Sequence, residues 1–309
     1  MTITSVDLIE QIQEVKRQRN AVILAHSYQR PEVQDVADFV GDSLGLSRLA
    51  ASTPADVIVF AGVYFMAETA AILNPNKTVL IPDPDAGCSL SDTISAKDVQ
   101  LWRDENPDGQ VVAYVNTSAE VKALSDVCVT SANAVEVVAQ LDSSRPIFFL
   151  PDMFLGAHVE RQTGIKMHIW MGECHVHAGI GTKEIEETLI AHPNAEFMIH
   201  PECSCGSSCL YLKPDAKMLS TEGMVRYAQG SQRNEFVIAT EVGIVHRLNA
   251  MAPGKKFLPV KEDAICEYMK MITLEKVYDS LVEDRYVVKV DPEIARKAKK
   301  AIDAMIKVG

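Results

Sequence analysis

The sequence predicts an α/β fold in which short parallel strands are covered by helices on both faces. Apolar runs rich in β-branched residues recur along the 309-residue chain, and each stops abruptly in a polar or glycine-containing loop. Continuous apolar runs, without an alternation of apolar and polar residues, indicate strands that are buried on both sides. Segments of helical composition and length separate these runs. Together the observations favour a doubly wound arrangement.

Eleven of these runs are expected to form strands. In chain order they cover residues 21–25, 57–60, 78–81, 111–115, 127–129, 147–150, 167–170, 197–199, 217–219, 236–239 and 257–260. The first 20 residues lack the apolar core of a signal peptide and are expected to form a helix that leads into the first strand. Between strands, residues 119–123, 132–141 and 183–191 are expected to be helical. Eleven strands are many for one open sheet, so we expect the sheet to be divided.

Two polar stretches are expected to cap helices. Asp42 and Ser43 follow Gly41, and residues 130–133 read Thr-Ser-Ala-Asn, which are residue types that accept hydrogen bonds from the first backbone N–H groups of a helix. A helix N-terminus with Ser and Thr is also suited to bind an anion. These stretches are therefore compatible with both a structural role and phosphate or carboxylate binding.

The composition argues against several classes of protein. The chain has 30 Lys and Arg against 42 Asp and Glu, a net charge of −12, which disfavours a nucleic-acid-binding protein that works through a strong positive field. No apolar run reaches the roughly 18 residues of a membrane-spanning helix. We therefore expect a cytoplasmic protein with neither nucleic acid nor membrane as a partner.

The seven cysteines are not expected to form a disulfide framework, because their number is odd and cytosolic thiols stay reduced. Three of them, Cys88, Cys174 and Cys266, each come shortly after a predicted strand, at spacings of 86 and 92 residues. This spacing matches a small α/β domain of three or four strands. Length alone, at about 150 residues per domain, predicts two domains.

Polar residues follow the predicted strands, where parallel sheets bind their ligands. These positions hold His26, Ser27, Tyr28, Tyr64, Glu68, Asp83, Asp85, Cys88, Asn116, Ser118, Thr130, Ser131, Asn133, Asp152, Glu173, Cys174, His175, His177, His200, Glu202, Cys203, Ser220, Thr221, Thr240, Glu241 and Cys266. If three domains met at their strand ends, these residues would surround one cavity.

The three separated cysteines allow two interpretations. Structural zinc favours paired cysteines two to four residues apart, which Cys88, Cys174 and Cys266 do not provide. Three thiolates could instead hold an iron–sulfur cluster with one iron open to a substrate oxygen. The alternative is three buried structural cysteines.

A second group, Cys203, Cys205 and Cys209, lies in a Gly- and Ser-rich loop. Its spacing is compatible with zinc, a redox disulfide, cluster ligands or an inert loop. Just before it, Glu202 follows a predicted strand, where a general acid or base would face a cleft; the alternative is a surface carboxylate. The chain has neither of the glycine-rich patterns of dinucleotide and P-loop sites.

Motifs along nearly the whole chain resemble the quinolinate synthase family, the A protein of bacterial NAD biosynthesis. The matching stretches are His26-x-Tyr28-Gln29, Gly41-Asp42-Ser43, Pro82-Asp83, 86–90, Tyr114-Val115-Asn116, 130–133, 149–152, Cys174-x-x-His177, 200–203, Ser220-Thr221-x-Gly223-Met224, 240–243 and Cys266 with Met269-Lys270.

The resemblance implies a fold, a reaction and a cofactor. The fold would be three similar three-layer α/β/α domains around a pseudo-threefold axis, which we assign to residues 1–84, 85–171 and 172–290, with a C-terminal helix at 291–309 that packs on the first domain. The reaction condenses iminoaspartate with dihydroxyacetone phosphate to quinolinate, with loss of phosphate and water. The cofactor is a [4Fe–4S] cluster whose open iron acts as a Lewis acid. A transient contact with an aspartate-oxidising enzyme would supply the unstable imine.

Carried over to this chain, the resemblance implies three groups of site residues. The cluster ligands are Cys88, Cys174 and Cys266. The catalytic residues are Glu202, His26, Tyr28 and His200, with Glu202 as the acid/base near the open iron. The substrate-binding residues are Ser43, Tyr114, Asn116, Ser131, His177 and Thr221.

Two features depart from the family pattern. His175 stands where Pro is more usual, and we choose His177 over His175 as the substrate contact because of its spacing from Cys174. The loop from Cys203 to Cys209 is rich in cysteine and is a candidate redox switch. Two other functions remain open: an Fe–S dehydratase that acts on another hydroxy acid, and a thiol-based redox or metal sensor.

Overall fold

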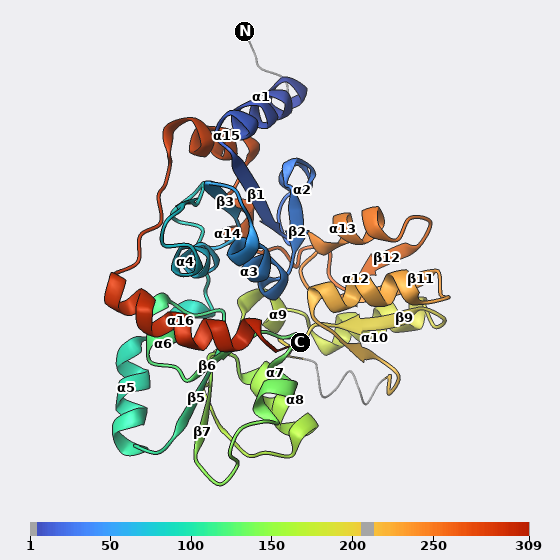
Figure 1. The fold of residues 1–309 in the computed structure, drawn as a ribbon. Helices are drawn as coiled ribbons and strands as arrows, with labels where there is room; N and C mark the ends of the chain where they lie inside the picture. Colours follow the sequence, from blue (N-terminus) through green and yellow to red (C-terminus); the bar gives the residue numbers. More distant parts are fainter. Residues whose placement is uncertain (1–4, 205–212, 309) are drawn as a thin grey trace.

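Three four-stranded parallel sheets form the framework of the protein. The structure is a computed structural model that describes residues 5–204 and 213–308. In every sheet the second strand in chain order lies at one edge beside the first, and the third and fourth strands follow on the other side. The expected α/β class and the expected division of the sheet are both confirmed, and Figure 1 shows the three resulting units.

The first unit contains α1 (Ser5–Gln18), β1 (Ala21–His26), α2 (Pro31–Val36), β2 (Phe39–Gly41), α3 (Ser43–Ser52), β3 (Val57–Ala61), α4 (Tyr64–Leu73) and β4 (Thr78–Leu80). The second unit contains the short 3-10 helix η1 (Ser91–Thr93), α5 (Ala96–Glu105), β5 (Gln110–Tyr114), α6 (Ala119–Ala123), β6 (Val127–Val129), α7 (Ala134–Val138), β7 (Ile147–Leu150), α8 (Met153–Thr163) and β8 (His168–Ile169).

The third unit contains α9 (His175–Ala178), α10 (Thr182–Ala191), β9 (Glu196–Ile199), β10 (Lys217–Met218), α12 (Thr221–Gly230), β11 (Glu235–Ala239), α13 (Ile244–Met251) and β12 (Lys256–Pro259). Three helices follow the last strand: α14 (Glu267–Lys270), α15 (Leu274–Glu283) and α16 (Pro292–Ile306).

The eleven expected strands are all present, but the sequence missed β2. This strand has three residues, and Phe39 is exposed, so it offers no buried apolar run. The expected helices at 119–123 and 183–191 are confirmed as α6 and α10. The helix expected at 132–141 is shorter in the structure, where α7 spans only Ala134–Val138. Its sequence contains three valines, which favour helix only weakly.

The path of the chain explains why helices cover both faces of each sheet. From its first strand the chain steps to one edge, and then reverses to add the third and fourth strands. Because parallel crossovers are right-handed, this reversal moves the connecting helices from one face to the other. Accordingly α3 packs with α4, α7 with α8, and α12 with α13. All strands of a sheet then end at one edge, where their loops gather.

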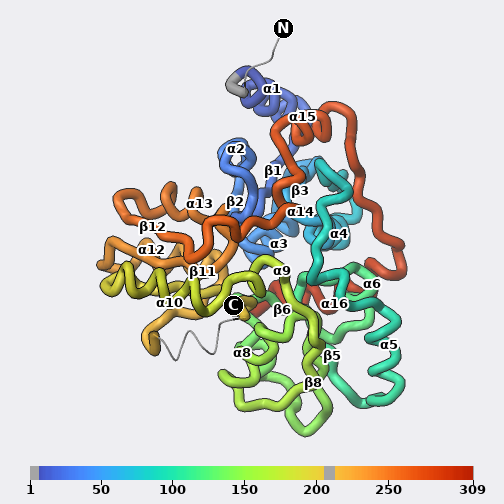
Figure 2. The backbone as a smooth tube through the Cα atoms, turned by 180° about the vertical axis from the view of Figure 1, so that it is seen from behind, coloured from blue at the N-terminus to red at the C-terminus, as the bar shows by residue number. Residues whose placement is uncertain are grey.

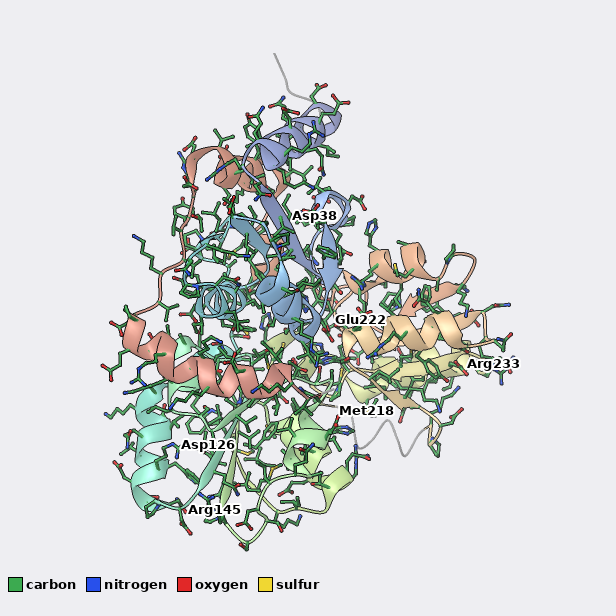
Figure 3. All side chains as sticks on the ribbon, viewed as in Figure 1. Asp38, Asp126, Arg145, Met218, Glu222 and Arg233 are labelled. Atoms are coloured by element: carbon green, nitrogen blue, oxygen red, sulfur yellow. The ribbon has the colours of Figure 1, made fainter. Side chains whose placement is uncertain are left out.

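Two equivalent aspartates fasten the second strand to the first in the first two units. Asp38 precedes β2 and Asp126 precedes β6, and each carboxylate accepts a hydrogen bond from a backbone N–H of the neighbouring first strand. Each aspartate also pairs with a cation of the helix that precedes this first strand: Asp38 with Lys16 of α1 at 2.7 Å, and Asp126 with Arg103 of α5 at 2.8 Å. Both aspartates are labelled in Figure 3, and they show the repeat at the level of side chains.

The last helices return to the earlier units. Helix α15 packs against α1 and β3, and Val287 pairs with Leu80 of the first sheet. Helix α16 lies against α6 and β6 of the second unit and also contacts α3 and α4 of the first, as Figures 1 and 2 both show. Residues on both sides of the expected boundary at residue 290 therefore pack against the first unit: α15 and Val287 before it, and α16 after it. The domain boundaries stay a prediction.

We expect Asn133→Ala to destabilise the protein, because Asn133 joins the second unit to α16. Its amide Nδ2 donates to the carbonyl oxygens of Met305 at 3.1 Å and Val308 at 3.2 Å. Loss of these buried bonds should lower the free energy of unfolding by about 1–3 kcal/mol, measured in urea. Asn106→Ala is the control, because Asn106 Nδ2 donates only to Trp102 of its own helix. Equal losses in the two variants would contradict a linking role.

Candidate active site

The first strand of each sheet ends in a pair of polar residues two positions apart. Strands β1, β5 and β9 lie inside their sheets. The pairs are His26 and Tyr28, Tyr114 and Asn116, and His200 and Glu202. All six side chains line one cavity.

A hydroxyl follows the second strand of each sheet. Ser43 begins α3 after the N-cap Asp42, whose carboxylate accepts from Gly45 N at 2.8 Å, as the sequence predicted. Thr221 begins α12 in the same way after its own serine N-cap. Ser131 holds the equivalent place after β6, although the cap position there is Asn133, whose side chain makes no cap hydrogen bond.

A repeated backbone hydrogen bond fixes the loops that carry the three cysteines. In each unit a residue just after the third strand donates its N–H to the carbonyl oxygen two residues before the cysteine. The three bonds are Tyr64 N to Ala86 O at 2.7 Å, Met153 N to Gly172 O at 2.9 Å, and Val242 N to Ala264 O at 3.0 Å. Cys88, Cys174 and Cys266 are therefore structurally equivalent, in agreement with their sequence spacing.

Close packing explains the glycine before Cys174. A Cβ atom at Gly172 would lie 2.4 Å from Thr93 Oγ1 and 2.5 Å from the carbonyl oxygen of Pro151, which is too short for any other residue. The strand end and the cysteine loop therefore touch through their backbones.

One cavity collects all thirteen residues that the family resemblance assigned to the site, but not every polar residue that follows a predicted strand: Ser27, Glu68, Asp83, Asp85, Ser118, Asn133, Asp152 and Glu173, among others, do not line it. It encloses about 720 Å³, including its opening to solvent. Its lining includes His26, Tyr28, Ser43, Cys88, Tyr114, Asn116, Ser131, Cys174, His177, His200, Glu202, Thr221 and Cys266. These thirteen residues therefore converge on one cavity from three separate sheets.

A buried cluster of His177, Glu202 and Cys174 lies at the centre of the cavity wall. His177 Nδ1 is 3.2 Å from both Glu202 Oε2 and Cys174 Sγ, and its Nε2 is 2.9 Å from Thr240 Oγ1. Burial alone would lower the pKa of His177, but the neighbouring charges of Cys174 and Glu202 raise it to about 10. His175, by contrast, is exposed and lies 2.6 Å from Ser89 Oγ through its Nδ1.

Glu202 is a buried carboxylate that stays ionised. Burial alone would raise its pKa, but His177, His200 and the hydroxyl of Tyr114 hold the pKa well below the usual range of a carboxyl group. Tyr114 donates its hydrogen bond to Glu202 Oε1 across the boundary between the second and third units. This arrangement supplies a proton acceptor with a fixed direction.

His26 and His200 are neutral imidazoles in fixed orientations. His26 Nδ1 accepts from the backbone N–H of Tyr28 at 3.1 Å, so its Nε2 carries the proton that it can donate. His200 Nε2 lies 3.2 Å from Ser131 Oγ, and its ring stacks on His177 with centroids 4.9 Å apart. Burial lowers the pKa of His26 to about 3 and that of His200 to about 4.

Two buried tyrosines remain protonated at neutral pH. Burial raises the pKa of Tyr28 and of Tyr114 well above the ordinary value of the phenol. The Tyr28 hydroxyl lies 2.5 Å from Thr240 Oγ1, and 3.4 Å from His177 Nε2. The Tyr114 proton is donated to Glu202, whereas the Tyr28 hydroxyl can donate to a bound oxygen when it accepts from Thr240.

The donor set of the cavity fits a metal group held by thiolates. Cys174 and Cys266 occupy the N-cap positions of α9 and α14. Burial raises the pKa of Cys88 to about 12 and that of Cys266 to about 11, with backbone N–H groups acting in the opposite sense. Thiolates buried in this way need a cation, and zinc and iron–sulfur clusters are the groups that thiolates hold.

A single ion is the competing possibility. Ligand atoms of Cys174, His177 and Glu202 all lie within 4.8 Å of one another, which is the reach of one metal ion. Cys88 and Cys266 do not belong to that set, although they line the same cavity. In the described residues the three equivalent cysteines do not form such a compact set with one another.

Several residues of the site carried no assigned role at the sequence level. Thr240 and Glu241 follow β11 and were recognised as polar residues at a strand end and as part of a family motif, and Lys270 only as part of a motif. In the structure Thr240 contacts both His177 and Tyr28, and Glu241 forms an ion pair with Lys270 at 2.9 Å. These contacts join residues 29, 63 and 212 positions apart, and no local sequence pattern predicts them.

The cysteine-rich loop lies partly outside the described residues. Cys203 is buried, and its thiol donates to the carbonyl oxygen of Ala239 at 3.2 Å. Cys205 and Cys209 fall in residues 205–212, which the structure does not describe.

Comparison with known proteins decides the family. A family model described as "Quinolinate synthetase A protein" matches residues 10–307. The chain belongs to this family. It is 68% identical over 302 residues to a quinolinate synthase from Thermus thermophilus, a match that covers 98% of this chain and 97% of that protein.

Other members of the quinolinate synthase family are nearly as similar. One from Pyrobaculum aerophilum is 57% identical over 302 residues, with 96% of this chain and 98% of that protein covered. One from Mycobacterium tuberculosis is 52% identical over 307 residues, with 97% and 88% covered. The resemblance drawn from the sequence motifs is confirmed, and the chain is an enzyme of this family. Within residues 5–204 and 213–308, no helix has the length and apolar character needed to cross a membrane.

We expect the metal-free protein to lose stability as the pH falls from 6.5 to 5, because of its buried neutral histidines. Unfolded His26 binds a proton below its ordinary pKa of 6.5, whereas folded His26 does so only near 3. The free energy of unfolding therefore falls by about 1.4 kcal/mol per pH unit for each such histidine, as proton linkage requires.

The variant His26→Gln should reduce this slope by about that amount, measured by urea unfolding at several pH values. The window lies above the ordinary range of carboxyl groups, so Glu202 contributes little to it. Identical slopes for the variant and the wild type would contradict the buried neutral state of His26.

Proposed function

We propose that the chain makes quinolinate by condensing iminoaspartate with dihydroxyacetone phosphate, with loss of phosphate and water. The observation that carries the proposal is the convergence of thirteen residues from three sheets on one cavity. Membership of the quinolinate synthase family supports the same reaction. The reaction needs proton transfers and the binding of two anionic substrates, and the residues of the cavity offer groups for both.

The proposal includes a [4Fe–4S] cluster held by Cys88, Cys174 and Cys266. When bound, such a cluster with one open iron supplies a Lewis acid for a departing hydroxyl. The three cysteines support it through their equivalent positions on the cavity wall.

In this proposal Glu202 transfers the protons of the condensation and the dehydration. Its carboxylate is ionised and oriented by Tyr114 and His177, so it can accept a proton from bound substrate. His26 Nε2 and the Tyr28 hydroxyl are donors that can bind a carbonyl oxygen, and His200 supplies a second neutral imidazole.

The anionic groups of the substrates are assigned to hydroxyl and amide donors. Ser43 and Thr221 each begin a helix of ten residues, where backbone N–H groups favour an anion. Ser131 offers a further hydroxyl. The Asn116 amide can donate to an anion through its NH2, and its buried oxygen, which has no hydrogen-bond partner in the described residues, can accept from a substrate N–H or O–H. His177 and Tyr114 complete the substrate-binding set. Tyr114, His177 and Thr221 are buried, which limits the access of water to the groups that they contact.

The proposal also covers location and partners. A cytoplasmic protein keeps its thiols reduced, as cluster ligands require. Iminoaspartate is unstable in water, so a transient contact with an aspartate-oxidising enzyme is the proposed source of this substrate. The competing functions are an Fe–S dehydratase for another hydroxy acid and a thiol-based sensor; the first would hold a cluster without forming quinolinate, and the second would show no turnover.

Glu202→Gln should lower kcat for quinolinate formation by about 10²–10⁴-fold, because an amide cannot accept the proton. The measurement is quinolinate formed under anaerobic conditions from dihydroxyacetone phosphate and iminoaspartate. Glu235→Gln is the control: Glu235 lies in the same unit but pairs on the surface with Lys256. Full activity in the Glu202 variant would contradict the assigned role, and no quinolinate from the wild type would contradict the proposed function.

Protein purified without air should contain about four iron atoms and four acid-labile sulfides per chain. Cys88→Ala should lose most of both, because it removes one of three ligands. Cys128→Ala is the matched control, since Cys128 is a buried cysteine of β6 that does not line the cavity. Zinc in place of iron, or equal iron in the two variants, would contradict the cluster assignment.

A further inference from the structure

A buried ion pair lies directly behind Cys266. The Glu241 side chain is fully buried, and its Oε1 accepts hydrogen bonds from Lys270 Nζ at 2.9 Å and from the backbone N–H of Cys266 at 3.1 Å. Its other oxygen, Oε2, accepts from Gly243 N at 2.7 Å. The carboxylate therefore holds the backbone of a proposed cluster ligand.

The same pair reaches across to the first unit. Lys270 Nζ donates to the backbone carbonyl oxygen of Tyr28, one of the proposed catalytic residues. Two further bonds reinforce this contact between units: Arg30 Nε donates to Lys270 O at 2.8 Å, and Gln34 Nε2 donates to Gly243 O at 3.0 Å. One ammonium group thus connects the loop after β1 with the loop after β12.

The packing around the pair leaves no room for adjustment. A Cβ atom at Gly243 would lie 2.7 Å from Glu241 Oε2, and 2.8 Å from both Lys270 Nζ and the carbonyl oxygen of Tyr28. Two of these atoms, Lys270 Nζ and the carbonyl oxygen of Tyr28, are hydrogen-bonded to each other, so a larger residue at Gly243 would displace them.

Stability alone is a poor explanation for such a pair. Removing a Lys and a Glu from water is costly, and apolar residues of similar volume often give an equally stable or more stable protein. Groups that hydrogen-bond behind a metal ligand, in contrast, fix its orientation and tune the metal. Glu241 and Lys270 are placed to act in this way, because Glu241 bonds to the backbone of Cys266 and Lys270 bonds to the backbone of Tyr28.

We propose that Glu241 and Lys270 are positioning residues that couple the ligand Cys266 to the catalytic Tyr28. The inference rests on the proposed function: Glu241 orients the backbone of Cys266 behind the cluster, and Lys270 keeps Tyr28 at a fixed place relative to it. Neither side chain reacts with substrate. Their effect on the reaction is transmitted through the two residues that they hold.

The test compares Lys270→Met with Lys256→Met. The two lysines belong to ion pairs of the same length, 2.9 Å, in the same part of the chain, but the Lys256 pair lies on the surface. After anaerobic reconstitution, Lys270→Met should lose its cluster in air about 10–100-fold faster than the wild type, followed by the visible absorption, and its kcat should fall over a similar range. Lys256→Met should match the wild type in both.

A second variant guards against simple misfolding. Glu241→Gln keeps the size of the side chain and one oxygen for Cys266 N, but it removes the charge that Lys270 needs. It should also shorten the lifetime of the cluster at a temperature at which circular dichroism shows the protein folded.

A purely structural pair gives a different result: a lower melting temperature, with cluster lifetime, kcat and KM unchanged in the folded variants. That result would overturn the inference. A wild-type protein that holds its cluster but forms no quinolinate would contradict the proposed function alone, and the cluster lifetimes would still decide the inference. A wild type without a cluster would overturn both.

Discussion

The site depends on one repeated constraint, the backbone hydrogen bond that ties each cysteine loop to the end of the third strand of its sheet. It occurs three times with nearly the same length, at Tyr64, Met153 and Val242. Because each sheet has the same strand order, these bonds place three cysteines at equivalent points around a common centre. No single sheet could supply such a set, since its strand ends all lie along one edge.

Burial at that centre determines what the side chains can do. His26 and His200 are neutral, while Glu202 remains ionised because His177 and Tyr114 stabilise its charge. The three units thus share one chemical environment in which each contributes different groups at equivalent positions. A threefold framework with unequal side chains brings proton donors, a proton acceptor and thiols to the same cavity.

The sequence predicted the framework well because parallel strands buried on both faces leave a strong local signal. It missed β2, whose exposed Phe39 breaks that signal, and it overestimated the length of α7. The convergence of the site residues could be suggested only through the cysteine spacing and the family motifs. The pairing of Glu241 with Lys270, and of Lys270 with Tyr28, could not be predicted, because it depends on how separate sheets pack.

The most direct test of this account is X-ray diffraction from anaerobically grown crystals, with anomalous data collected at the iron edge. We expect one compact group of iron atoms bonded to Cys88, Cys174 and Cys266 and close to Glu202. A single metal ion bound by Cys174, His177 and Glu202, with Cys88 and Cys266 left as free thiols, would contradict the central claim that the threefold repeat exists at this centre to hold one shared cluster.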